Sequence, residues 1–111
     1  MNNTKKINQE KIDREREEAW VGDAVLALWV REWMLKEFGK IMGEAFVRFT
    51  SNGFLSHFGN PTSVEAEIGR IYQESGLEGA FAHMEEKLLP VFLVQEKVYQ
   101  KRQLQKKKRK A

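Results

Sequence analysis

The sequence predicts an all-α domain, and three observations lead to this prediction. A long apolar run of helix-forming residues spans 19–35. No segment shows the alternation of apolar and polar residues that marks a half-buried strand. Residues typical of helix ends recur along the chain, namely Gly39, Asn60, Pro61, Gly76 and Pro90. The chain has 111 residues, 41% of them hydrophobic and 32% charged, which suffices for one folded domain.

The first half of the chain predicts one long helix and two short ones. Residues 7–18 are charged and rich in helix formers but have little apolar stripe, so we expect an exposed lead-in. The first helix is predicted from about Arg16 to Phe38, ending at Gly39. Apolar residues surround it almost completely, which is typical of a long, central, buried helix. A second helix is predicted at Lys40–Thr50, and a short apolar helical turn at 54–58.

The second half of the chain predicts three further helices. The first begins after a proline, with Thr62 as its N-cap and Glu65 three residues later, the pattern of a capping box. This helix is expected to end at Gly76. Another amphipathic helix covers 77–89, and a proline then opens a last helix over 91–105.

Composition argues against several classes of protein. The chain has no cysteine, which rules out disulfides and thiolate metal sites, and its two histidines lie far apart, which argues against a zinc enzyme. No apolar run approaches the roughly 20 residues that span a bilayer. The N-terminus lacks the apolar core of a secretory signal. We therefore expect a cytoplasmic protein without a membrane segment.

Basic residues are concentrated at the C-terminus. The net charge is only +3, yet the chain from Lys101 onward contains bases and no acid, while the remainder has more acids than bases. A basic tail favours an anionic partner, and a solvated, frayed terminus explains the same composition equally well. The sequence thus divides into a charged lead-in at 1–15, a helical domain at 16–100 and a basic tail at 101–111.

Two carboxylates stand out by their position. Asp23 lies within the long apolar helix, where an unpaired charge is costly, so it is expected to be paired, protonated or bound to a metal. Glu65 lies in the first turn of a later helix, where spacing alone favours a capping role. Two interpretations remain for Asp23: an ion pair with Arg16 or Arg31, or a role as a metal ligand. Two such oxygen ligands from separate helices can hold Mg²⁺.

Three short segments of the chain form a set when they are taken together. Residues 20–26 have the sequence Trp-Val-Gly-Asp-Ala-Val-Leu, and residues 51–55 have Ser-Asn-Gly-Phe-Leu. Residues 65–72 have Glu-Ala-Glu-Ile-Gly-Arg-Ile-Tyr, followed by Gly-Leu-Glu at 76–78. In this order they resemble the ribonuclease III family, with its Gly-Asp-Ala-Val-Leu signature helix, its Ser-Asn-x-x-Leu junction and its Glu-Ala-x-x-Gly-x-x-Tyr motif. The resemblance covers roughly residues 16–90.

The resemblance implies a compact, all-α, metal-dependent endoribonuclease. By position, Asp23 and Glu65 match the catalytic, metal-binding aspartate and glutamate of the family, so for both residues the resemblance favours the metal role. Members hydrolyse phosphodiesters of double-stranded RNA with Mg²⁺, and we expect Mn²⁺ to substitute. The attacking nucleophile would be a water activated by the metal.

The resemblance also implies two kinds of partner. Members form homodimers, and here the signature helix with Trp20, Trp29 and Trp33 is the expected contact. The second partner is double-stranded or structured RNA, read by shape and by phosphate contacts. The tail residues expected to contact its phosphates are Lys106, Lys107, Lys108, Arg109 and Lys110.

Two positions depart from the larger members of the family. Those members have a glutamate one turn before the aspartate, where this chain has Ala19, and an aspartate three residues before the glutamate, where it has Thr62. The Mini-ribonuclease III branch is similar to this chain at both positions and also lacks a separate RNA-binding domain, although its insertion between the motifs is longer. Fewer carboxylates imply weaker metal binding, one ion in place of two, or a degenerate RNA-binding or ribosome-associated module that does not cleave.

Overall fold

A computed structural model describes residues 2–110, and the side chains of residues 5–109. Its helices are α1 (Asn2–Phe38), α2 (Gly43–Thr50), α3 (Asn52–Leu55), α4 (Pro61–Lys87) and α5 (Leu89–Lys110). Residues 2–110 contain no strand, so the predicted all-α fold is confirmed. Within this described range, no helix combines the length and apolar character needed to cross a membrane.

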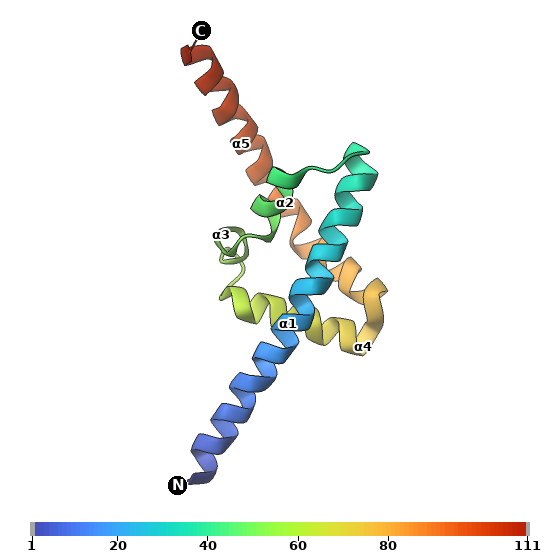
Figure 1. The fold of residues 1–111 in the computed structure, drawn as a ribbon, viewed down its shortest axis with the longest axis vertical. Coiled ribbons are helices and arrows are strands. Elements are labelled where there is room, and N and C mark those ends of the chain that lie inside the picture. Colours follow the sequence, from blue (N-terminus) through green and yellow to red (C-terminus); the bar gives the residue numbers. More distant parts are fainter. Residues whose placement is uncertain (1, 111) are drawn as a thin grey trace.

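Helix α1 runs obliquely along much of the length of the molecule (Figure 1). It begins at Asn2, well before the predicted start at Arg16, so the charged lead-in is itself helical. The predicted stop is confirmed: Gly39 has φ of 69°, and its N–H donates to the carbonyl of Leu35 at 2.9 Å. The start of α1 and the end of α5 point in opposite directions in Figure 1, and the molecule measures 66 × 30 × 20 Å.

The segment that follows α1 departs from the predicted helix at Lys40–Thr50. Helix α2 begins only at Gly43, and Ile41 is 87% exposed in the connection that turns the chain back toward α1. Ile41 was expected to lie within this helix, but residues 39–42 form the connection in which the chain reverses direction. The short helix α3 is capped by Ser51, whose hydroxyl accepts from the N–H of Phe54 at 3.1 Å.

Helix α4 is capped by Asn60 and not by Thr62. The Asn60 side chain accepts from the N–H groups of Thr62 at 2.9 Å and Ser63 at 3.3 Å, and the proline that follows Asn60 occupies the first helical position. The predicted Thr62 cap and its capping box with Glu65 are therefore wrong. Gly76, with φ of 70°, interrupts α4 where a helix end was predicted, and the chain doubles back there.

Helix α5 is longer than predicted. It begins at Leu89, with Pro90 in its first turn, where the missing N–H of a proline needs no partner. It continues beyond Gln105 to Lys110, so the basic tail is helical and not frayed coil. Its second half extends away from the body of the molecule in Figure 1.

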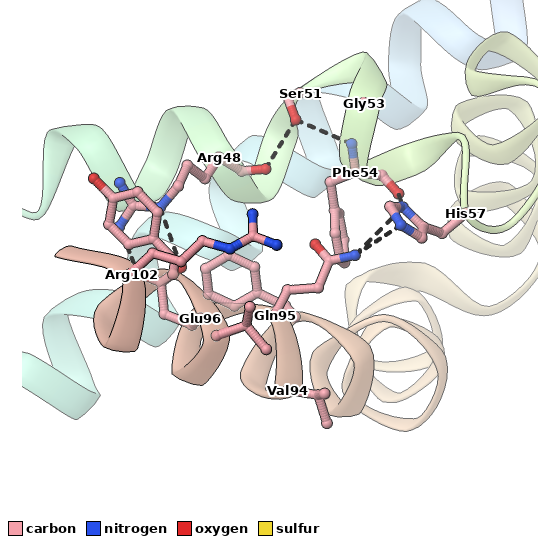
Figure 2. A pocket seen from close by; sticks show the side chains of 12 residues that line it. Arg48, Ser51, Gly53, Phe54, His57, Val94, Gln95, Glu96 and Arg102 are labelled. Atoms are coloured by element: carbon pink, nitrogen blue, oxygen red, sulfur yellow. Dashed lines mark hydrogen bonds and ion pairs between the residues drawn. The ribbon is translucent and has the colours of Figure 1, made fainter. Parts of the chain in front are cut away.

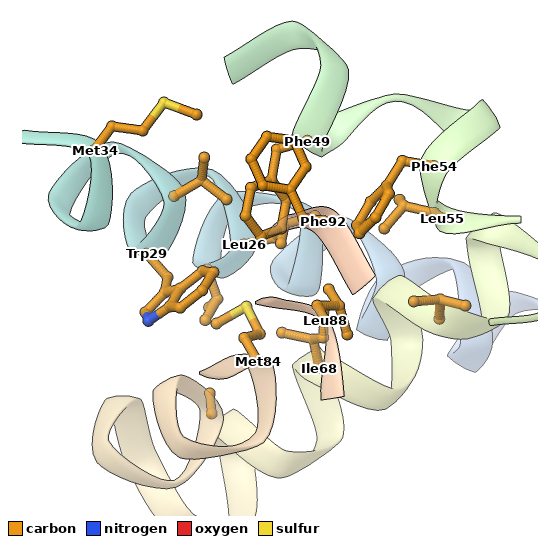
Figure 3. Packing of buried hydrophobic residues seen from close by; sticks show 14 of the residues in the cluster. Leu26, Trp29, Met34, Phe49, Phe54, Leu55, Ile68, Met84, Leu88 and Phe92 are labelled. Carbon is orange, nitrogen blue, oxygen red and sulfur yellow. The ribbon is translucent and has the colours of Figure 1, made fainter. Parts of the chain in front are cut away.

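The core is an aromatic cluster centred on Phe49 of α2 (Figure 3). Phe49 is fully buried and stacks on Phe92 of α5, with ring centroids 4.1 Å apart. Trp29 of α1 and Phe54 of α3 meet its ring edge-on at 5.6 and 5.2 Å. Helices α1, α2, α3 and α5 each contribute at least one ring, and α1 adds Trp33 edge-on to Phe49 at 6.0 Å. Offset or edge-on pairs of this kind are favourable beyond their buried area.

Burial divides α1 into two faces. Leu26 and Val30 are buried against the other helices, whereas Trp20 is 81% and Leu35 is 51% exposed. The prediction of a central helix holds for the buried face and is wrong for the opposite one. Helix α4 makes most of the contacts to α1, and α2 packs on it as well.

Candidate functional site

Helices α1 and α4 cross with their backbones in direct contact. A Cβ atom added at Gly22 would overlap the carbonyl group of Glu65, and one added at Gly69 would overlap that of Glu18. Both glycines are buried. Any larger residue at either position would push the two helices apart. These two glycines therefore set the distance between the helices that hold the two candidate carboxylates.

Polar contacts and buried side chains hold this crossing in place. The hydroxyl of Ser63 on α4 donates to Oε1 of Glu15 on α1 at 3.3 Å. Nη1 of Arg70 on α4 donates to Oε2 of Glu18 on α1 at 3.4 Å, and Glu18 is only 8% exposed. Ile68 is completely buried beside them. The two helices are thus fixed by close packing and by bonds on their flanks.

At this crossing the structure brings Asp23 and Glu65 together. The side chain of Glu65 is half-buried, and its pKa rises from 4.5 to about 7. Burial is the largest cause, followed by the hydrogen bond that protonated Glu65 donates to Asp23, and then by the negative charge of Asp23. The two carboxyl groups thus oppose each other when both are ionised.

The surroundings of Asp23 correct two expectations. Asp23 is exposed, although it lies on a largely apolar helix, and its carboxyl group still reaches Glu65 of α4. It forms no ion pair with any described side chain, Arg16 and Arg31 included. The guanidinium of Arg31 instead lies 4.4 Å from the centre of the Phe46 ring. A structural ion pair therefore does not account for Asp23.

The donor set of the crossing fits a hard divalent cation. Asp23 and Glu65 supply two carboxylates, and no positively charged side chain is among the causes of the pKa shift of Glu65. Residues 5–109 contain no group of three or more acidic, histidine or cysteine side chains able to hold a metal, since Ala19 and Thr62 add no carboxylate. Mg²⁺ retains several waters and binds through one or two carboxylates. The two residues would hold such an ion with its remaining positions open to water or phosphate.

An apolar groove of about 510 Å³ adjoins Asp23 on the exposed side of α1. Trp20 and Leu28 of α1 line it, together with Tyr72 and Leu77 of α4. The expectation that Trp29 lies on the same surface as Trp20 is wrong, because Trp29 is 6% exposed in the core cluster. Trp33 is partly buried against that cluster, and its ring stacks on that of Trp29 at 6.4 Å. Trp20 is therefore the tryptophan that lines this groove.

The structure does not bring the basic tail to the carboxylates. The exposed side chains of Lys106, Lys107, Lys108 and Arg109 lie on the part of α5 that extends away from the crossing of α1 and α4 (Figure 1). Lys110 was also predicted as a contact, but its side chain lies outside the described residues. Any RNA that meets both parts must reach from the crossing to the end of α5.

Sequence reasoning missed the roles of Glu18 and Gly69. Glu18 was taken as part of a solvated charged segment, yet it is a buried charge paired with Arg70. Its spacing of four residues from Gly22 places both on the face that meets α4, which is the signal available in the sequence.

The chain was compared with protein-family models, with curated proteins and with solved structures, and none of them matches.

Proposed function

We propose that this protein is a Mg²⁺-dependent endoribonuclease of the ribonuclease III type, acting on double-stranded or structured RNA. The observation that supports this most is the pairing of Asp23 with Glu65, two residues far apart in the sequence that meet at one crossing. Like charges at short range destabilise a fold unless a cation or a proton neutralises them. Two carboxylates at one crossing favour a cation site over a purely structural role.

Asp23 and Glu65 would have different roles in holding the ion. Gly22 allows the backbone of Glu65 to approach α1, and half-burial restricts the Glu65 side chain, so this residue would fix the position of the ion. Asp23 is exposed and would hold the ion on the side open to substrate. When bound, Mg²⁺ would activate a water and offset negative charge on the phosphodiester. Both carboxyl groups must be ionised, so metal binding is expected to weaken below pH 7.

The basic end of α5 would supply phosphate contacts. Lys106, Lys107, Lys108 and Arg109 are exposed on a helix that projects from the body. Replacing all four with glutamine is expected to weaken RNA binding and to reduce the dependence of affinity on salt, because fewer counterions are released. Fluorescence anisotropy at several salt concentrations measures both effects. An unchanged slope would exclude the tail from the RNA contact.

A second copy of the chain would cover the apolar groove beside Asp23. Trp20 is 81% exposed at this groove, and exposed apolar patches of this kind mark protein contacts. Multi-angle light scattering is expected to give a dimer for the parent protein and a monomer for Trp20→Glu. A parent protein that stays monomeric at all concentrations would contradict the homodimer.

Cleavage of a long RNA duplex with Mg²⁺ or Mn²⁺ tests the activity. The parent protein is expected to cut the duplex, while Asp23→Asn and Glu65→Gln are expected not to. Glu74→Gln is the matched control, because Glu74 is an exposed acid on the same helix as Glu65 and forms no ion pair with any described residue. Equal cutting by Asp23→Asn would show that the site is assigned wrongly.

One observation favours a second candidate function, a non-cleaving RNA-binding or ribosome-associated module. Ala19 is buried and Thr62 carries a hydroxyl, so the donor set at the crossing stops at two carboxylates. This candidate predicts that the parent protein binds the duplex but leaves it intact with either metal. Specific cutting that Asp23→Asn abolishes would exclude it.

A further inference from the structure

A second groove, of about 520 Å³, lies between α5 and the segment formed by α2 and α3 (Figure 2). It shares no lining residue with the groove beside Asp23. Phe54 and Phe92 of the core line it, together with polar side chains and two exposed valines of α5. Cavities of this size, apolar with a few polar groups, are typical of small-ligand sites. The groove is thus separate from the carboxylate crossing.

Two arginines line the groove, and one of them is free for a ligand. Arg48 forms an ion pair with Glu96 through two of its nitrogens, and its guanidinium lies 3.8 Å from the centre of the Tyr99 ring. Both the charge and one flat face of Arg48 are therefore already used. Arg102 is exposed and forms no ion pair with any described side chain. Arg102 is thus the side chain here that can meet an anionic group.

The opposite part of the groove presents an oriented amide. Nδ1 of His57 lies 3.0 Å from the carbonyl oxygen of Phe54, which can only accept, so this nitrogen bears the proton in neutral His57. Nε2 of His57 then accepts from the amide nitrogen of Gln95 at 2.9 Å. The same amide nitrogen lies 3.5 Å from Nδ1, whose proton is donated to Phe54, so the amide oxygen of Gln95 and its second N–H have no partner among the described residues. Figure 2 shows Gln95 with His57 on one side and Arg102 on the other.

An apolar surface adjoins these two polar groups. Val94 is 64% and Val98 is 45% exposed, and both line the groove on α5. The groove therefore offers an amide with adjacent donor and acceptor, an apolar wall, and a guanidinium. A nucleobase has a hydrogen-bonding edge and an apolar face, and its phosphate suits an arginine. These three features match the parts of one nucleotide.

We propose that this groove binds an unpaired nucleotide of an RNA strand. The proposal rests on the proposed function, because it assigns to the same RNA substrate a single-stranded segment next to its duplex. Charge continuity supports RNA over an acidic peptide: α5 continues from Arg102 into the exposed bases Lys106, Lys107, Lys108 and Arg109, which can follow a phosphate backbone. The Gln95 amide and the apolar wall contribute contacts that an acidic side chain does not use.

Binding of three labelled RNAs in EDTA tests the proposal without cleavage. The probes are a blunt duplex, the same duplex with a six-nucleotide single-stranded extension, and the six-nucleotide strand alone. Fluorescence anisotropy is expected to show that the extension tightens binding about five- to tenfold, the range of one or two stacked or hydrogen-bonded contacts. Gln95→Ala is expected to remove most of this gain, and each variant is accepted only if its melting temperature stays near that of the parent.

Arg102→Gln and Lys101→Gln form a matched pair. Both remove one positive charge from neighbouring positions of α5, but only Arg102 lines the groove, while Lys101 is exposed outside it. Arg102→Gln is expected to remove most of the gain from the extension, whereas Lys101→Gln should weaken the blunt and extended duplexes equally. Equal effects of the two variants on that gain would overturn the proposal.

The outcomes separate this proposal from the proposed function. If the parent protein cuts the duplex with Mg²⁺ but the extension adds no affinity, the groove proposal fails and the activity stands. If the six-nucleotide strand binds in an Arg102-dependent way while no duplex is cut, the groove proposal stands and the activity fails. An acidic peptide that displaces the labelled strand more effectively than unlabelled RNA would assign the groove to a protein partner and overturn the proposal.

Discussion

Replacing Glu65 with glutamine is expected to stabilise the metal-free protein at pH 8 and to change its stability little at pH 5. The pKa of Glu65 is about 7 in the folded protein against an ordinary value of 4.5. Between these values the unfolded chain has lost the proton that the folded protein still binds. The free energy of unfolding of the parent protein therefore falls as pH rises through this window and is constant above it.

The magnitude follows from the size of the pKa rise. One pKa unit corresponds to about 1.4 kcal/mol, so the rise at Glu65 sets an upper value of about 3 kcal/mol. The carboxyl group is only half-buried, and solvent screening reduces this to about 1–2 kcal/mol. Glutamine has no charge to repel Asp23 and does not lose this stability above pH 7.

Urea unfolding in EDTA at pH 5 and pH 8, followed by tryptophan fluorescence, measures the difference. Glu74→Gln is the control, because it removes an exposed acid of the same helix that forms no ion pair with any described side chain, and it is expected to have no pH-dependent effect. Mg²⁺ should stabilise the parent protein at pH 8 more than Glu65→Gln. If Glu65→Gln gains no stability over the parent between pH 5 and pH 8, Asp23 and Glu65 do not oppose each other and the proposed site loses its main support.

Three further substitutions test the architecture around the site. Gly22→Ala is expected to lower the free energy of unfolding by more than about 3 kcal/mol in urea, because the backbone carbonyl that the new Cβ meets cannot rotate away. Gly43→Ala has open space around the new Cβ and should cost almost nothing. Similar values for the two variants would refute the close crossing. Asn60→Ala is expected to cost about 1 kcal/mol by loss of the cap, and a larger cost for Thr62→Ala in the same thermal unfolding series would restore the capping box. Glu18→Gln should lower the free energy of unfolding by about 1–2 kcal/mol. This is less than the cost of breaking a fully buried ion pair, because the side chain of Arg70 is half exposed. A variant more stable than the parent would count against this ion pair.

Single glycines in the sequence correctly predicted two positions at which a helix stops or breaks. Gly39 and Gly76 both adopt positive φ where the chain was expected to stop a helix, because glycine alone reaches that region without a steric cost. Competing local signals were harder to resolve. Asn60 and Thr62 are both good caps two residues apart, and the proline between them decided in favour of Asn60 by taking the first helical position.

Burial and pairing required the tertiary structure. Ile41 has core-like spacing from the helix that follows it, yet it is 87% exposed, because the chain needs those residues to reverse direction. Trp20 and Trp29 belong to the same apolar run, but one is at the surface and the other is in the core. Spacing along a helix states which residues share a face, and it does not state which faces another helix will cover.

The sequence by itself determined that the chain is helical, that Gly39 ends the first helix and Gly76 breaks a later one, and that Asp23 and Glu65 are unusual acids for their segments. These properties depend on backbone preferences and on neighbours within a few residues. Only the tertiary structure decided that the two acids oppose each other, because that requires α1 and α4 to cross at Gly22 with their backbones touching. Contact between residues so far apart in the chain depends on which helix faces pack together, and the packing of the whole core selects those faces.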